Sequence, residues 1–246
     1  MFTLKRLRRF FPLALLLLVA LPHRAHADPE NNLKNCNDPD PKIRIIGCSN
    51  LINDPNETAD MRAKALDHRG VAFLAEGDTT RAIADFTEAM KVDPKNASPA
   101  YNRGYTYMTL GDNEHAAEDY SKAISIDPKY AKAYFNLSIV HHKLGKDKLA
   151  IDDLTQFIAL VPGDVDAYRH RGTLFLLDNQ YERAIADLSE VLRRTKRDAY
   201  VYFVRGEAYQ RLGDKDRAIA DYRAALRIDP NLKPAAEGLR DLGATP

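Results

Sequence analysis

The chain has 246 residues, of which 45% are hydrophobic and 29% are charged. This composition is typical of a folded protein and excludes an intrinsically disordered chain, which would need fewer apolar residues or a larger net charge. The formal net charge is only +1, so a nucleic acid is not an expected partner.

Residues 1–27 have the pattern of a secretory signal peptide. A basic start that includes Arg8 and Arg9 precedes an apolar run of 12 residues, and cleavage is expected after Ala27. A membrane anchor is the alternative, but 12 helical residues are too short to cross about 30 Å of hydrocarbon. We therefore expect no stable membrane insertion after cleavage.

Removal of this segment takes away five basic residues and no acidic one. The mature chain then has 31 basic and 35 acidic residues, a formal net charge of −4. The expected location is the periplasm of a Gram-negative bacterium or the medium outside it. The sequence does not distinguish general secretion from twin-arginine export.

Residues 28–62 are expected to form a polar, mobile arm as far as Cys36, followed by one helix from Pro41 to Ile52. Cys36 and Cys48 are the only cysteines, and an exported chain meets an oxidising compartment, so we expect them to form a disulfide. Two free thiols are the alternative. The apolar residues expected to cover the next helices are Ile43, Ile46, Leu51 and Ile52.

A period of 34 residues follows. The dipeptide Arg-Gly recurs in phase at Arg69, Arg103, Arg171 and Arg205, and Leu137 stands at the missing position. The period divides the chain into five units, 63–96, 97–130, 131–164, 165–198 and 199–232. Each unit contains two stretches with helical spacing of apolar residues, separated by a turn such as Gly77-Asp78. Residues 233–246 are expected to contain a capping helix from Pro234 to Leu242.

These units resemble the tetratricopeptide repeat, with a small residue and an aromatic in the first helix, alanines in the second and a closing proline. In the second unit the matching residues are Gly104, Tyr107, Ala116, Tyr120, Ala123 and Pro128. The sequence Asn102-Arg103-Gly104 is similar to a signature of secreted bacterial repeat proteins. The resemblance implies an all-α fold, a right-handed superhelical solenoid of antiparallel helix pairs with an N-terminal helix and a C-terminal cap.

The recurring arginines are matched by aspartates at the same period, Asp85, Asp119, Asp153, Asp187 and Asp221. We expect each arginine to form a structural ion pair with an aspartate of its own or a neighbouring unit. An anion-binding ladder of arginines is the alternative.

No signature of catalysis or cofactor binding occurs, so the sequence predicts a protein that is not an enzyme and has no cofactor. His141 and His142 are adjacent and point about 100° apart on a helix, which prevents joint chelation of one metal ion. His142 and His170 could converge in a groove, but no metal site is expected.

In a superhelix of this kind the first helices line a concave face, which the resemblance implies takes an extended peptide or a partner helix. Helical register places ten residues as the main partner-binding candidates: Tyr101, Tyr105, Met108, Phe135, Ile139, His142, Arg169, Leu176, Tyr200 and Phe203. Aromatic and apolar side chains with a polar rim are typical of protein-binding surfaces. Packing between units is the alternative role for each of them.

The expected function is that of a non-catalytic periplasmic adaptor or scaffold. A chaperone or assembly factor for exported or outer-membrane proteins is the alternative, and an enzyme acting on cell-wall material is a third class that no carboxylate pair supports. The sequence names neither the partner nor the oligomeric state.

Overall fold

The computed structural model describes residues 29–195 and 197–245, so the predicted signal peptide and its cleavage site lie outside the described residues. The described chain is all-α and contains no strand. Its helices are α1 (Pro29–Cys36), α2 (Pro41–Asn53), α3 (Ala59–Ala75), α4 (Thr79–Val92), α5 (Ser98–Leu110), α6 (Asn113–Ile126), α7 (Ala131–Lys143), α8 (Asp147–Leu160), α9 (Val165–Leu177), α10 (Tyr181–Thr195), α11 (Ala199–Arg211), α12 (Lys215–Ile228) and α13 (Lys233–Asp241).

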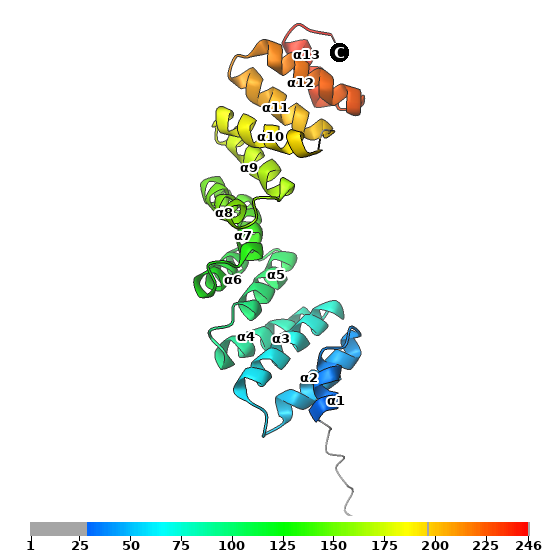
Figure 1. Cartoon of the computed structure of the whole chain (residues 1–246), viewed down its shortest axis with the longest axis vertical. Coiled ribbons are helices and arrows are strands. Elements are labelled where there is room, and N and C mark those ends of the chain that lie inside the picture. Colours follow the sequence, from blue (N-terminus) through cyan, green and yellow to red (C-terminus); the bar gives the residue numbers. More distant parts are fainter. Residues whose placement is uncertain (1–28, 196, 246) are drawn as a thin grey trace, which may run out of the picture.

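The helices stack in chain order into an elongated superhelical array, with α1 at one end and α13 at the other (Figure 1). Each helix packs against the next one, and first helices of neighbouring pairs also touch, as α3 touches α5 and α9 touches α11. The pairs α3/α4, α5/α6, α7/α8, α9/α10 and α11/α12 correspond to the five sequence units. No pair buries its apolar face alone, so stability comes from the stacking of neighbours.

The turns inside the pairs show why the helices end where they do. Gly77, Gly111, Gly145 and Gly213 have φ between 70° and 81°, and Asn179 takes the same left-handed conformation with φ of 60°. In three of these turns the residue directly after the glycine caps the second helix: the carboxylates of Asp78, Asp112 and Asp214 accept hydrogen bonds from backbone N–H groups in its first turn. The turn thus stops one helix and starts the next.

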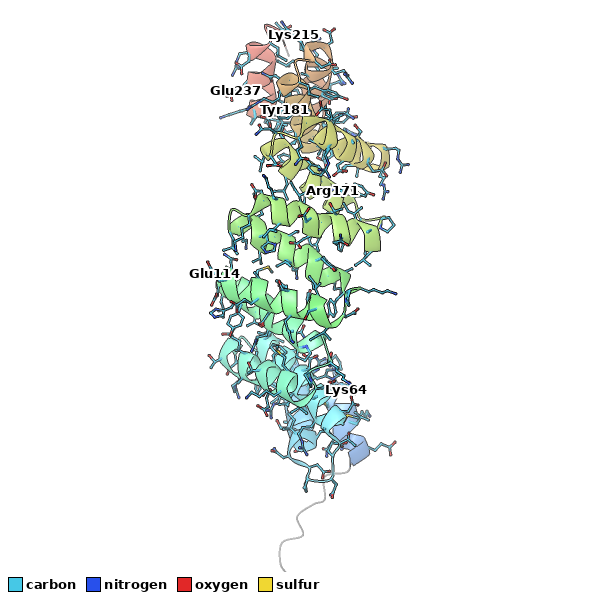
Figure 2. All side chains as sticks on the ribbon, turned by 90° about the vertical axis from the view of Figure 1, so that its left-hand side faces the viewer. Lys64, Glu114, Arg171, Tyr181, Lys215 and Glu237 are labelled. Carbon is cyan, nitrogen blue, oxygen red and sulfur yellow. A yellow bond between two sulfur atoms is a disulfide. The ribbon has the colours of Figure 1, made fainter. Side chains whose placement is uncertain are left out.

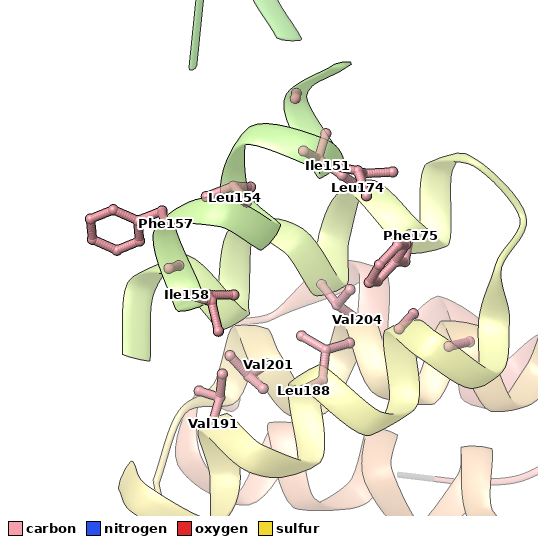
Figure 3. Packing of buried hydrophobic residues seen from close by; sticks show 14 of the residues in the cluster. Ile151, Leu154, Phe157, Ile158, Leu174, Phe175, Leu188, Val191, Val201 and Val204 are labelled. Carbon is pink, nitrogen blue, oxygen red and sulfur yellow. The ribbon is translucent and has the colours of Figure 1, made fainter. Parts of the chain in front are cut away.

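Close packing within a pair depends on a glycine in its first helix. A Cβ at Gly206 would lie 2.8 Å from the ring of Tyr222, and one at Gly104 would lie 3.2 Å from the ring of Tyr120. Between units, aliphatic side chains of α8, α9, α10 and α11 form one continuous core (Figure 3). The core of the third, fourth and fifth units is therefore shared between neighbouring units.

The N-terminal end differs from the sequence prediction. Residues Pro29–Cys36 form a helix that packs on α2, so the expectation of a mobile arm is wrong. A disulfide joins Cys36 to Cys48, both of which are buried. Asn32 is buried too and accepts a hydrogen bond from Asn50 Nδ2 at 2.9 Å. The polar helix α1 is held on α2 by this disulfide and by the close approach of the α1 backbone to Gly47. The composition of α1 alone does not predict either contact.

The apolar residues of α2 are used only in part. Leu51 is buried at the contact with α3, but Ile43 and Ile46 are 39% and 60% exposed, so the expectation that they cover the first unit is wrong. The disulfide turns the Cys48 face of α2 inward, and Ile46 two positions earlier lies on another face of the helix. At the other end, Leu239 of α13 is fully buried against α12.

The repeated arginines join each unit to the one before it. In Figure 2 the labelled Arg171 lies inside the stack: its Nε and one terminal nitrogen donate to Asp187 at 2.7 and 2.9 Å, and the other donates to Thr155 Oγ1 of the preceding unit at 3.1 Å. Arg69, Arg103 and Arg205 repeat this arrangement with Asp85, Asp119 and Asp221 and with Ser49, Thr87 and Ser189.

These four arginine side chains are only 14–21% exposed, and all three nitrogens of each guanidinium are engaged. The geometry is that of structural bidentate pairs within a unit and leaves no open row of cations for an anion. In the third unit, where Leu137 replaces arginine, Asp153 Oδ2 instead lies 2.6 Å from His141 Nδ1. Burial raises the pKa of Asp153, and the hydrogen bond from His141 opposes that rise.

Asp67, a residue whose register places it on the concave face, is buried between the first two units. Its two carboxylate oxygens accept hydrogen bonds from Ser98 Oγ at 2.7 Å and Asn102 Nδ2 at 2.8 Å. Burial raises the pKa of Asp67, while these two hydrogen bonds and the nearby His68 act in the opposite direction. Asn102, part of the Asn-Arg-Gly sequence, therefore serves as a link between units.

Replacing Gly206 by Ala is expected to lower the free energy of unfolding by about 1–3 kcal/mol, because the new methyl group would overlap the Tyr222 ring. Helix propensity alone predicts the opposite sign, a gain of about 1 kcal/mol. Denaturant unfolding followed by circular dichroism measures the change. Gly163→Ala is the matched control, since no atom lies within 4 Å of its added methyl group. Equal effects at the two sites would contradict the packing argument.

Replacing Asp67 by Asn is expected to change stability in a pH-dependent way. A buried carboxyl group with a raised pKa does not lower the free energy of unfolding while it is protonated in both the folded and the unfolded state. Its destabilising effect grows as the pH rises from 3.8, the ordinary pKa of aspartate, through the raised pKa of the folded state. The stability of Asp67→Asn relative to wild type should therefore increase between about pH 3 and 7. Thermal unfolding across this range measures the difference, with the exposed Asp152→Asn as control. A relative stability that falls with pH would refute the assignment.

Candidate functional site

The first helices of the third, fourth and fifth units line one side of the array and form a groove. One pocket of about 290 Å³ is bounded by residues of α7, α9 and α11, among them Ile139, His142, Thr173 and Tyr200, with Leu154 of α8 behind them. A second pocket of about 260 Å³ spans the joint between α5 and α7 and continues to the start of α9. The groove is therefore hollowed at two neighbouring places.

Three of the predicted groove residues have large side chains that are about half exposed. Tyr105 and Tyr200 are 45% and 48% exposed, and the side chain of His142 is 52% exposed. Leu177, at the end of α9, is 56% exposed. Such residues are available to a partner without unfolding or rearrangement, because they make few contacts in the free protein.

Tyr101 and Phe135 have a different environment. The Tyr101 ring lies 5.7 Å from that of Tyr120 and 5.1 Å from that of Tyr130, and its hydroxyl accepts a hydrogen bond from Asn136 Nδ2 at 3.1 Å. Burial raises the pKa of Tyr101. These contacts show that Tyr101 packs between the second and third units, although part of it also lines the second pocket.

Phe135 joins the third unit to the fourth in the same way. Its ring stacks on His170 at 5.6 Å and contacts Phe157 at 5.1 Å. Because Phe135 is half-buried among these rings, an alanine there would weaken the joint between units as well as any partner contact. Neither Tyr101 nor Phe135 is thus a clean probe of partner binding.

The remaining candidates are divided between groove and core. Ile139 lines the larger pocket. Leu176 and Phe203, in contrast, are partly buried against the core. Met108 accepts a hydrogen bond from the hydroxyl of Tyr120 at 3.8 Å. Phe203 also borders a third hollow of about 240 Å³ between α11 and α13. There burial raises the pKa of Glu207, with Arg211 opposing it.

Arg169 lies at the rim of the larger pocket and is held by two acidic side chains. It forms an ion pair with Asp166 of its own helix and donates to Asp198 Oδ2, the N-cap of α11, at 3.1 Å. The charge of Arg169 is thus neutralised locally, and its Nε–H is buried without a partner among the described residues.

The described residues contain no cluster of three or more histidine, cysteine, aspartate or glutamate side chains that could hold a metal ion. His142 and His170 do line the same pocket, but His142 Nδ1 is engaged by Asp147 Oδ1 at 2.6 Å and His170 is stacked on Phe135. In the same part of the chain, no helix has both the length and the apolar character needed to cross a bilayer.

Two features with the 34-residue period escaped the sequence prediction. The hydroxyl partners of Arg103, Arg171 and Arg205 stand 16 residues before them, as Thr87 stands before Arg103, whereas Ser49 stands 20 residues before Arg69. In the first, fourth and fifth units a second arginine lies over the aromatic ring that stands four residues after the paired arginine: Arg183 lies 4.0 Å from the Phe175 ring and Arg81 lies 4.2 Å from the Phe73 ring. Both features can be found in the sequence by aligning the five units position by position.

Comparisons with solved structures agree with this architecture. The structure resembles YrrB, described as a TPR protein with an unusual peptide-binding site, with a TM-score of 0.68 and 20% identity over 72% of this chain and 92% of that chain. It resembles MamA with a TM-score of 0.61 and 27% identity over 65% and 94% of the two chains. It also resembles PilF of Pseudomonas aeruginosa, with a TM-score of 0.63 and 17% identity over 87% and 95%.

No curated protein matches the chain in sequence. Family models do match it: the TPR repeat model over residues 70–111 and 104–145, and tetratricopeptide repeat models over residues 131–163 and 199–232. These matches together cover more than half of the described array and follow the units defined by the 34-residue period. The chain is therefore a tetratricopeptide repeat protein.

Proposed function

We propose that this protein is a non-catalytic adaptor that binds a peptide segment or a helix of a partner protein on its concave face. The observation that carries the proposal is the exposure of large side chains on the first helices, Tyr105, Leu177 and Tyr200, of which Tyr200 lines the larger pocket. Exposed aromatic and aliphatic groups beside a pocket are the usual energetic anchors of protein interfaces. The printed description of YrrB, with its peptide-binding site, supports a groove of this kind in a repeat array of similar fold.

The proposal includes export to the periplasm of a Gram-negative bacterium or to the medium. Its support is the basic and apolar character of residues 1–27, together with the buried Cys36–Cys48 disulfide, a bond that persists in oxidising compartments. The Asn102-Arg103-Gly104 sequence, which is similar to that of secreted repeat proteins, points in the same direction. The periplasmic adaptor is the leading form of the proposal.

The binding surface is tested by capture from a periplasmic extract with three purified mature proteins. Tyr105→Ala/Tyr200→Ala removes two exposed groove residues, and we expect it to retain a specific partner at least about tenfold less than wild type, as for interface anchors. Glu118→Ala/Lys122→Ala, on the exposed face of α6, is the control and should retain the partner fully. Quantitative mass spectrometry measures the bound protein.

Equal retention by the two double variants would place the partner elsewhere and refute the groove. Retention of many unrelated proteins, combined with suppressed aggregation of unfolded model proteins, would replace the adaptor by the chaperone or assembly factor. Circular dichroism and thermal unfolding of both variants establish that they stay folded, which is expected because all four residues are exposed.

Export is tested separately by fusing residues 1–27 to a reporter enzyme that is active only after forming its own disulfides. We expect activity in a Gram-negative host and a mature full-length chain that begins at Asp28 and carries no free thiol. A fusion with Leu15→Arg and Leu17→Arg, which interrupts the apolar run, is the control and should be inactive. An inactive wild-type fusion, or an uncleaved chain with two free thiols, would refute export.

A further inference from the structure

The second helix of each unit places one large side chain against the first helix. In the first, second and fifth units this residue is aromatic, namely Phe86, Tyr120 and Tyr222, and each ring packs on the glycine of its partner helix. The same position in the third unit is Leu154. Because the units share one backbone arrangement, they serve as internal references for one another.

The tyrosine of the second unit shows what this ring normally contacts. Tyr120 is fully buried; its hydroxyl donates to Met108 Sδ at 3.8 Å, and Asn136 and Tyr105 lie close enough to influence its ionisation. In the fifth unit the hydroxyl of Tyr222 donates to Gln210 Oε1 at 2.5 Å. Met108 and Gln210 are equivalent residues, so both rings point along the same direction toward the groove.

The third unit has a pocket in the corresponding place. Its lining includes Ser138, Ile139, His142 and His170, which stand 34 residues after the four residues around the Tyr120 ring: Gly104, Tyr105, Met108 and Asn136. Leu154 forms the inner wall and is too short to reach His142. The volume of about 290 Å³ exceeds the roughly 150 Å³ in which a dry apolar cavity accepts benzene.

The polar groups of the pocket suit a phenol. Asp147 Oδ1 lies 2.6 Å from His142 Nδ1, so a neutral His142 carries its proton on Nδ1 and leaves Nε2 as an acceptor for an O–H group. No acidic side chain lines the pocket, so nothing there repels the electron-rich face of a ring.

We propose that this pocket takes a tyrosine side chain from an extended segment of the partner protein, which supplies in trans the ring that Tyr120 and Tyr222 supply within their own units. The inference rests on the proposed function and names the chemistry of its ligand. Insertion buries the ring beside Leu154 and Ile139 and places its hydroxyl at His142, in the manner that Tyr222 meets Gln210.

The test uses three acetylated and amidated pentapeptides, Gly-Gly-Tyr-Gly-Gly and its Phe and Ala counterparts, titrated into the isotope-labelled mature protein and followed by NMR. We expect saturable shifts at α7 and α9 with the tyrosine peptide, about three- to tenfold weaker binding of the phenylalanine peptide from loss of one hydrogen bond, and none with alanine. Equal binding of all three peptides would overturn the proposal.

The decisive variant fills the pocket from within. Ser138→Gly/Leu154→Tyr gives the third unit the glycine and tyrosine of the second, and it should lose at least tenfold in affinity for the tyrosine peptide while staying folded. Ser138→Gly alone is measured beside it, so that the loss of affinity caused by the added ring is the difference between the two variants. His142→Ala, an exposed site that does not threaten folding, should abolish only the preference for tyrosine over phenylalanine. Unchanged affinity in the filled variant, or an unchanged preference in His142→Ala, would refute the assignment.

The same filled variant separates this inference from the function on which it rests. If it still captures the partner in the extract experiment while Tyr105→Ala/Tyr200→Ala does not, the groove is correct and the tyrosine pocket is wrong. If no variant or wild-type protein captures a partner, the adaptor proposal fails, and the peptide titration still decides what the pocket accepts.

Discussion

The buried guanidinium is the interaction on which the array depends. Each of the four arginines binds an aspartate of its own unit with two nitrogens and a hydroxyl of the preceding unit, or of α2 in the case of Arg69, with the third. The pair fastens the two helices of a unit to each other, and the hydroxyl bond sets the rotation of that unit on its neighbour. Removal of one partner of a buried ion pair typically costs about 3–5 kcal/mol, because a charge is left without compensation. A solenoid has only contacts between neighbours, so such links carry a large share of its geometry.

Periodicity made most of the fold predictable. The recurrence of glycine, alanine and proline every 34 residues placed the helix pairs, and the Gly-Asp turns placed their ends. The sequence left open whether Arg103 pairs within its unit or across the joint, because Asp85 stands 18 residues before it and Asp119 stands 16 residues after it. Only the helix packing, which brings residue 119 beside residue 103, decides between them. The helix Pro29–Cys36 could not be anticipated, since its stability comes from Cys48 and Gly47 of the next helix and not from its own residues.

Helical register predicted which residues lie on the side of the groove, but it did not predict which of them are exposed and which pack between units. Helical phase put Tyr101, Tyr105 and Phe135 on one side, yet Tyr105 is exposed while Tyr101 and Phe135 fill the spaces between units. Phase alone cannot separate these cases, because the residue of the next unit that meets each ring lies about 35 positions away. The pocket beside Leu154 depends on a side chain from the second helix, which a reading of the first helices leaves out.

Leu137 gives the joint between the second and third units a different mechanical character. Its side chain offers no hydrogen bond, and Asp153 is satisfied by His141 inside the unit, so this joint lacks the buried ion-pair link of the others. It keeps the hydrogen bond from Asn136 to the hydroxyl of Tyr101, together with the apolar contacts of Leu137 and Val140. Apolar contacts are non-directional, so the curvature of the groove beside the Tyr101-lined hollow depends mainly on side-chain packing.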